Sequence, residues 1–464
     1  MIVTNRRDHR VIDGVARTAD LLEICDPATG ALVGRLPMAS AAEVRDAVRR
    51  ARAALPDWRR ASVASRGAGL LAAADALGER AAGLAELHHR ETGSPLDAAR
   101  DDVTLAIATL RRFAELGSLR HEATLRDRHR IDCSVPEPHG VAVVVTPWNE
   151  PVAAAAGLIA AALVTGNTVV HKPSERCPHL GLLLGSVLGG CLPDGVLGTV
   201  LGDGRSGALL AADTDVDVVA HTGSSFTAQA IAMAAALSGA HVVSTPHGSE
   251  SLLVDAGVDP DWAAERAAAA GFTRAGRERI YLHRGIADAF LDALTTRARD
   301  LNASGAAPPL VDQRLRETVA GQVHRALAAG ARCLEGGEVP DGPGAFYPAT
   351  VLTDCTPEME VMAEQALGPV APAMVVDTFD GALHAAAVRH PWPTATVLTG
   401  DLDHVQHAMV DLPAHTLRVN PSEVDGQRAV SIGARWAGNP LPYGPELLDE
   451  FTRLKVVQWA VPHH

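Results

Sequence analysis

The sequence predicts an α/β protein organised around a parallel sheet, because short apolar strands alternate with helical segments from residue 140 onward. Val141–Val145 is a continuous valine-rich run, typical of a strand that is buried on both faces. A second series of strands and helices begins after Thr245. The chain has 464 residues, which is enough for two or three domains.

Residues 40–118 are predicted to be helical. Ser40 and Glu43 have the spacing of a capping box before a helix over Ala41–Ala53, and Gly93 is a stop signal after a helical pattern over Arg66–Thr92. The first α/β series then continues with strand 141–145, a small-residue helix, strand 167–171, helix 179–188, strand 198–200, helix 206–212 and strand 216–221. The second series consists of strand 251–254, helix 262–270, strand 279–282 and helix 286–301. Thr452–Val461 is predicted to be a terminal strand, whose partner the pattern does not identify.

Charge and hydropathy exclude several classes of function. The chain has 55 acidic residues against 41 lysines and arginines, a formal charge of −14, so its surface should repel nucleic acid. The first ten residues lack the apolar core of a signal peptide, and the longest apolar run, Val152–Val164, is too short to span a bilayer. We therefore expect a cytoplasmic protein with neither a membrane nor nucleic acid as partner.

The six cysteines form no CxxC pair, and no cluster of histidine and cysteine has zinc spacing. Reduced structural thiols are the simplest interpretation, and no metal site is expected.

Nine short motifs resemble those of the aldehyde dehydrogenase superfamily, in the order and spacing of that family over nearly the whole chain. They are Asp26–Gly30, Glu91–Gly93, Pro147–Pro151, Gly166–Glu175, Thr222–Ser224, Arg279–Leu282, Gly368–Pro369, Val419–Asn420 and Phe451–Val457. The resemblance implies a dinucleotide-binding domain over residues 1–118 and 139–246, and an α/β catalytic domain over 247–446. It also implies a β-arm, formed by 119–138 and 447–464, that makes homodimers or homotetramers.

The resemblance places an NAD site on five residues. Lys172 and Glu175 would bind the adenosine ribose, and Ser224 would lie at the helix N-terminus that holds pyrophosphate. Trp148 would lie at the cofactor, and Gln365 replaces the glutamate that holds the nicotinamide ribose in the family. Because Glu175 would repel a 2′-phosphate, we expect NAD rather than NADP.

The catalytic centre departs from the family pattern. The family cysteine lies five residues before the arginine matched by Arg279, and this count reaches Arg274; residues 192–332 contain no cysteine at all. Thr245 replaces the general-base glutamate and cannot act as a base near neutral pH. Asn149 remains, and its amide would bind the developing oxyanion. His247 and Glu250 are the two alternative bases.

Three functions are open to this site: a non-covalent oxidoreductase, a non-redox carbonyl reaction such as condensation, imine formation or cyclisation, and a catalytically inactive structural homologue. Arg274 would repel oxidised nicotinamide by about 4 kcal/mol at about 4 Å unless an anion lay between them. A planar guanidinium binds carboxylate, phosphate or phosphonate well. The retained adenosine site therefore favours an NAD-dependent, cysteine-independent oxidoreductase that acts on a small anionic aldehyde or its hydrate.

Overall fold

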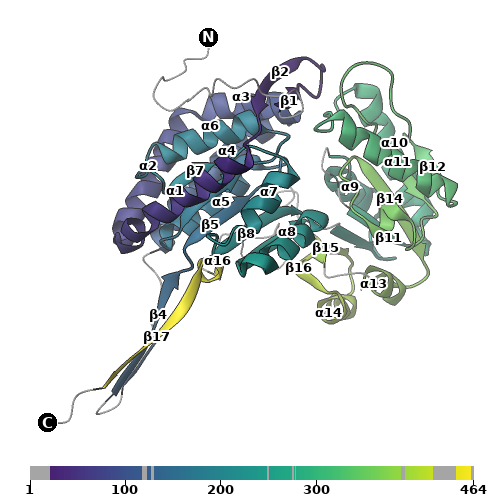
Figure 1. Cartoon of the computed structure of the whole chain (residues 1–464). Helices are drawn as coiled ribbons and strands as arrows, with labels where there is room; N and C mark the ends of the chain where they lie inside the picture. The colour runs from purple at the N-terminus through teal and green to yellow at the C-terminus, as the bar shows by residue number, and fades with distance from the viewer. Residues whose placement is uncertain are drawn as a thin grey trace.

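The computed structural model describes residues 21–117, 123–126, 130–247, 250–273, 276, 278–387, 392–421 and 446–460. It shows the α/β architecture with parallel sheets that the sequence predicts, with two lobes and a projecting arm (Figure 1). The boundaries 1–118, 139–246 and 247–446 of the predicted domains, and those of the arm, stay predictions. Among the described residues, no helix combines the length and the apolar character that a bilayer span requires.

The first lobe, which we call the five-stranded lobe, is built on a parallel sheet in the order β7-β6-β5-β8-β9. Its strands are β5 (Val141–Val145), β6 (Thr168–Lys172), β7 (Leu197–Thr199), β8 (Val218–Ser224) and β9 (His241–His247). The helices between them are α5 (Pro151–Val164), α6 (Pro178–Gly189), α7 (Gly204–Ala211) and α8 (Ser225–Ser238). Because all the strands are parallel, their carboxyl ends share one edge of the sheet.

Four helices that precede the sheet in sequence pack against this lobe: α1 (Ala41–Arg60), α2 (Val63–Glu79), α3 (Ala81–Thr92) and α4 (Leu96–Leu116). The predicted capping box of Ser40 and Glu43 is present at α1. Gly93 ends α3 in the left-handed conformation, with φ of 70°, as predicted. The helical pattern over Arg66–Thr92 is divided at Arg80, which ends α2 and precedes α3, and both helices pack on α4 and α6.

The seven-stranded lobe has the sheet order β12-β13-β14-β11-β10-β15-β16, in which only the β12–β13 pair is antiparallel. Its strands are β10 (Glu250–Val254), β11 (Glu278–His283), β12 (Arg332–Glu335), β13 (Thr350–Thr353), β14 (Val370–Val376), β15 (Trp392–Leu398) and β16 (Ala414–Val419). Its helices are α9 (Pro260–Gly271), the 3-10 turn η2 (Arg284–Ile286), α10 (Ala287–Ser304), α11 (Gln313–Ala328), α12 (Glu360–Ala363), α13 (Phe379–Ala387) and α14 (Leu402–Asp411).

The arm is a three-stranded antiparallel sheet in the order β17-β4-β3. It consists of β3 (Ala123–Arg126), β4 (Arg130–Pro138) and β17 (Thr452–Ala460), and α16 (Glu446–Glu450) leads into it. It points away from both lobes (Figure 1). The terminal strand was predicted, and the structure identifies β4 as its partner. A further hairpin, β1 (Leu21–Cys25) with β2 (Leu32–Pro37), was not predicted.

Helix α5 lies at the centre of the five-stranded lobe. All fourteen of its residues are buried, and seven of them are alanine. Small side chains let α5 pack closely on α4 and α2 as well as on the sheet. Trp148 and Asn149 lie just before this fully buried helix, separated from it by its N-cap residue, Glu150.

Candidate active and cofactor site

The predicted site residues of the five-stranded lobe meet at one edge of its sheet. Lys172 ends β6, which pairs with β5, and the loop after β5 carries Asn149. Strand β9 pairs with β8 so that Thr245 lies opposite Thr222 and His247 opposite Ser224. The carboxyl edge of a parallel sheet, at a change of strand order, is the usual ligand position in this class of fold.

Lys172 and Glu175, the predicted ribose-binding residues, lie side by side. The Lys172 side chain is buried, and its Nζ lies 3.4 Å from Glu175 Oε2 and donates to the Pro173 carbonyl at 3.2 Å. The Glu175 side chain stays 42% exposed, so its carboxylate can accept from a diol. Gly207 of α7 flanks the lysine, where an added Cβ would lie 3.8 Å from Lys172 Cδ. This cation, carboxylate and glycine fit the adenosine half of a dinucleotide.

The turn between β8 and α8 is the predicted pyrophosphate position, and it combines a serine N-cap with a glycine of positive φ. Ser224 caps α8, with its Oγ accepting from the Thr227 amide at 3.2 Å. Gly223 has φ of 153°, and a Cβ there would lie 2.7 Å from His221 Nε2, so only glycine fits. Burial, together with the positive charge of Lys172, lowers the pKa of His221 to about 4, so its imidazole is neutral. The positive end of the α8 helix dipole is therefore the feature of this turn that would attract an anion, since His221 adds no charge.

The loop after β5 is held by the neighbouring strand. Thr146 donates its amide to the Lys172 carbonyl at 3.2 Å, and its hydroxyl lies 2.9 Å from His171 Nε2. Burial lowers the pKa of His171 to about 3, so this partner is a neutral imidazole. Trp148 is buried and Asn149 is half-buried, which leaves the asparagine on the accessible side of the loop.

Two buried carboxylates, which the sequence analysis missed, support the two loops. Asp102 of α4 accepts from the Val152 and Ala153 amides, at 3.1 Å each, and so caps α5 from another helix. The helix needs this cap because its N-cap residue, Glu150, makes no side-chain capping bond. The His88 ring lies 3.5 Å from the same carboxylate.

Glu91 of α3 caps the start of α6, as Asp102 caps the start of α5. Its Oε1 accepts from the His179 amide at 3.1 Å and lies 2.7 Å from His179 Nδ1, and its Oε2 accepts from the Leu180 amide at 2.7 Å. The glutamate side chain is fully buried. Because α6 begins three residues after Glu175, Glu91 fixes the end of the ribose-binding loop. An acidic residue on the apolar face of a predicted helix was the signal that could have found both carboxylates.

The seven-stranded lobe contributes the other predicted positions. Glu250 begins β10 and lies opposite Glu278 of β11. Gln365 is partly buried in the segment between α12 and β14. Arg274 lies outside the described residues, so its predicted place opposite the nicotinamide stays a prediction. The strand register places the backbones of Thr245 and His247, which leaves their chemical roles as predictions too.

All six cysteines are free, and none lies in the segment that leads into β11. Burial raises the pKa of Cys355 to about 12, and burial also raises the pKa values of Cys191 and Cys333. Cys177 is fully buried at the start of α6. Burial thus keeps Cys177 and Cys355 from solvent, and the raised pKa values disfavour the reactive thiolate at Cys191, Cys333 and Cys355, whereas Cys25 is exposed.

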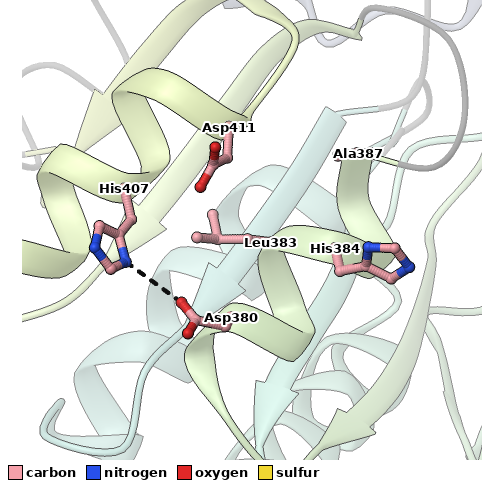
Figure 2. A pocket seen from close by; sticks show the side chains of 6 residues that line it. All are labelled: Asp380, Leu383, His384, Ala387, His407 and Asp411. Atoms are coloured by element: carbon pink, nitrogen blue, oxygen red, sulfur yellow. Dashed lines mark hydrogen bonds and ion pairs between the residues drawn. The ribbon is translucent and has the colours of Figure 1, made fainter.

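A cavity of about 400 Å³ lies elsewhere, between α13 and α14 (Figure 2). Its lining residues are Asp380, Leu383, His384, Ala387, His407 and Asp411. His407 Nδ1 lies 3.4 Å from Asp380 Oδ1, whereas His384 points away from this pair (Figure 2). No predicted site residue lines the cavity. In the part of the chain that the structure describes, no three histidine, cysteine or acidic side chains are grouped to hold a metal ion.

Comparison with known proteins agrees with this arrangement. The model of the aldehyde dehydrogenase family matches residues 15–457. A 3,6-anhydro-alpha-L-galactose dehydrogenase of Streptomyces coelicolor is 32% identical over 459 residues, covering 94% of this chain and 92% of that protein. Lactaldehyde dehydrogenase from Escherichia coli superposes with a TM-score of 0.87 at 26% identity, over 95% of each chain. PnpE in complex with nicotinamide adenine dinucleotide has a TM-score of 0.88 at 26% identity, over 96% of this chain and 95% of PnpE. The chain therefore belongs to the aldehyde dehydrogenase family.

Proposed function

We propose that this protein is an NAD-dependent oxidoreductase that oxidises a small anionic aldehyde, as its hydrate, without a cysteine nucleophile. The observation that carries the proposal is the retained ribose pair of Lys172 and Glu175 in a chain with no cysteine between residues 192 and 332. A hydrate already carries the oxygen that a thiolate mechanism must add from water. When bound, NAD accepts the hydride that the hydrate carbon releases as it becomes the carboxylic acid.

The chain supplies the remaining functions of the reaction. The Asn149 amide donates a hydrogen bond to the oxygen on which negative charge develops. A base takes one hydroxyl proton of the hydrate, and His247 or Glu250 provides it, because Thr245 cannot. Lys172 and Glu175 hold the adenosine ribose, and Trp148, Ser224 and Gln365 complete the cofactor contacts. The carboxylate of Glu175 disfavours a 2′-phosphate, which is why we propose NAD over NADP.

The substrate proposal rests on charge. Arg274 would place a permanent cation at the position of the family thiol, where oxidised nicotinamide is also positive. An anionic group on the substrate would lie between the two charges and relieve their repulsion. The relative named for 3,6-anhydro-alpha-L-galactose provides an uncharged comparison substrate.

We also propose a homodimer or homotetramer assembled through the arm. Strand β17 exposes apolar side chains, with Leu454 72%, Val456 62% and Trp459 67% exposed. A contact with a second copy would cover this surface. We propose a cytoplasmic location, in which the free cysteines would stay reduced.

The cofactor proposal predicts that Lys172→Ala weakens NAD binding by about 2 kcal/mol, or roughly 30-fold in Kd, because a charge-assisted contact is lost. Calorimetry with NAD, NADH and NADP measures the effect. Lys455→Ala is the control, since it removes the other lysine of the chain, which lies on the arm. If the unmodified protein binds none of these nucleotides at millimolar concentration, the oxidoreductase proposal is wrong, and a non-redox carbonyl reaction or an inactive homologue takes its place.

The mechanism predicts that no thioester-linked adduct forms when the protein turns over an aldehyde with NAD. No cysteine occupies the segment before β11, so alkylation of the free thiols should leave turnover unchanged. Mass spectrometry of the quenched reaction is the measurement. A kinetically competent adduct on Cys177 or Cys333 would contradict the proposal and would require a relocated nucleophile.

A further inference from the structure

Arg176 connects the ribose-binding loop to two other functional segments. It follows Glu175 directly, and its amide donates to Ser174 Oγ at 3.3 Å. Its guanidinium carbon lies 5.8 Å from the centre of the Trp148 ring, in the loop that carries Asn149. Its Nε lies 3.0 Å from Asp312 Oδ2, across the boundary between the two lobes. The side chain is only 20% exposed, so these contacts are partly shielded from water.

The two carboxylate oxygens of Asp312 make different contacts. It is the N-cap of α11, where Oδ1 accepts from the Leu315 amide at 2.7 Å, and its Oδ2 faces Arg176. The carboxylate therefore joins the start of a helix in the seven-stranded lobe to the nucleotide loop of the five-stranded lobe. A cation beside this carboxylate compensates for its partial desolvation.

Helix α11 carries the connection onward to Gln365. A Cβ added at Gly368 would lie 3.1 Å from both methyl carbons of Val319, so α11 packs directly on the segment that contains Gln365. Arg325 of α11 also makes two bonds to Glu360, of 2.5 and 2.9 Å, in the short helix before that segment. The Arg176–Asp312 contact and helix α11 thus connect the adenosine-ribose loop to the proposed nicotinamide-ribose segment.

We propose that Arg176 is a positioning residue that holds the two nucleotide half-sites at the separation that one NAD molecule spans. This inference rests on the proposed cofactor function. A dinucleotide must contact both lobes at once, and a link that fixes their spacing in advance lowers the ordering cost of binding. AMP contacts only the adenosine half, so its affinity does not depend on the link. An isolated surface ion pair would have no such selective effect.

The test is a double-mutant cycle with two ligands. Arg176→Met keeps a side chain over Trp148 but removes the charge, and Asp312→Asn keeps a residue that still caps α11. Calorimetry measures the Kd of NAD and of AMP for the parent protein, the two single variants and the double variant. Each single variant should raise the Kd of NAD about fivefold, and the double variant no further, while the Kd of AMP stays within about twofold. Arg176→Lys keeps the charge and should give an intermediate value.

The pair of Arg297 and Asp261 provides a matched control. It has the same 3.0 Å distance but lies wholly within the seven-stranded lobe. Arg297→Met and Asp261→Asn should leave the Kd values of both ligands unchanged. Equal losses of NAD and AMP affinity in the Arg176 variant, or additive effects in the cycle, would overturn the inference alone. Failure of the parent protein to bind NAD would overturn the proposed function and this inference with it.

Discussion

Replacing Glu91 with alanine is expected to lower the free energy of unfolding by about 3 kcal/mol, because the His179 and Leu180 amides would remain buried without an acceptor. The negative charge at the start of α6 would also be lost. Urea unfolding followed by circular dichroism measures the change. Since α6 begins just after the ribose-binding loop, the affinity for NAD should fall in the same variant.

Two variants serve as controls for this result. Glu91→Gln keeps one acceptor oxygen and the side-chain volume, so it should lose less stability than Glu91→Ala. Glu43→Ala removes the partly exposed glutamate of the α1 capping box and should cost only about 1 kcal/mol. An equal loss in Glu91→Ala and Glu43→Ala would contradict the assignment of Glu91 as a buried cap for α6.

Replacing Arg274 with alanine is expected to weaken the binding of a small anionic aldehyde by about 2–4 kcal/mol, because a desolvated charge pair is lost. Arg274→Lys keeps the charge but not the bidentate fork, so binding should weaken less. The measurement compares affinity and turnover for an anionic aldehyde and a neutral one of matched length, with 3,6-anhydro-L-galactose as a neutral polyhydroxy substrate.

Two further variants distinguish the effect of the Arg274 charge from the effect of the missing cysteine nucleophile. Arg274→Cys alone should not restore thiol-dependent oxidation, because Thr245 supplies no base for release of the acid. The double variant Arg274→Cys, Thr245→Glu should recover some of that activity. If the parent protein does not distinguish anionic from neutral substrates, and Arg274→Ala behaves like the parent, the proposal of an anionic substrate is wrong.

Local signals predicted many of the elements up to α10 and the terminal strand β17, but no individual element from α11 to β16. The Ser40 and Glu43 capping box, the left-handed Gly93 and the valine-rich β5 each depend on residues that are close in sequence, and each was confirmed. The break at Arg80 was not predicted, because the apolar spacing stays helical on both sides of it and the residue at the break is neither glycine nor proline. The pairing of β17 with β4, which is more than 300 residues earlier in the chain, follows from no local pattern, and only the family resemblance, which joins residues 119–138 and 447–464 in one arm, indicated it.

The site was predictable to a similar extent. Motifs located Lys172 at a strand end beside Glu175 and Ser224 at a helix N-terminus, because each motif carries its own turn or strand end, while the binding roles of these residues stay predictions. Asp102 and Glu91 were not recognised as supports, since each carboxylate meets its backbone partners only after distant helices pack together. Arg176 was not singled out for the same reason, as its partners Trp148 and Asp312 come from different lobes.

The complete burial of α5 has a consequence for how this family member can change over time. An amphipathic helix offers a solvent face on which neutral substitutions accumulate, but residues 151–164 have no such face. Selection on this segment therefore acts on side-chain volume at every position, and its substitution record should lack a helical period. A substitution of any of its alanines by a larger residue can persist only when a neighbouring residue in α2, α4 or the sheet is replaced by a smaller one. Accepted substitutions in α5 should therefore occur in compensating pairs.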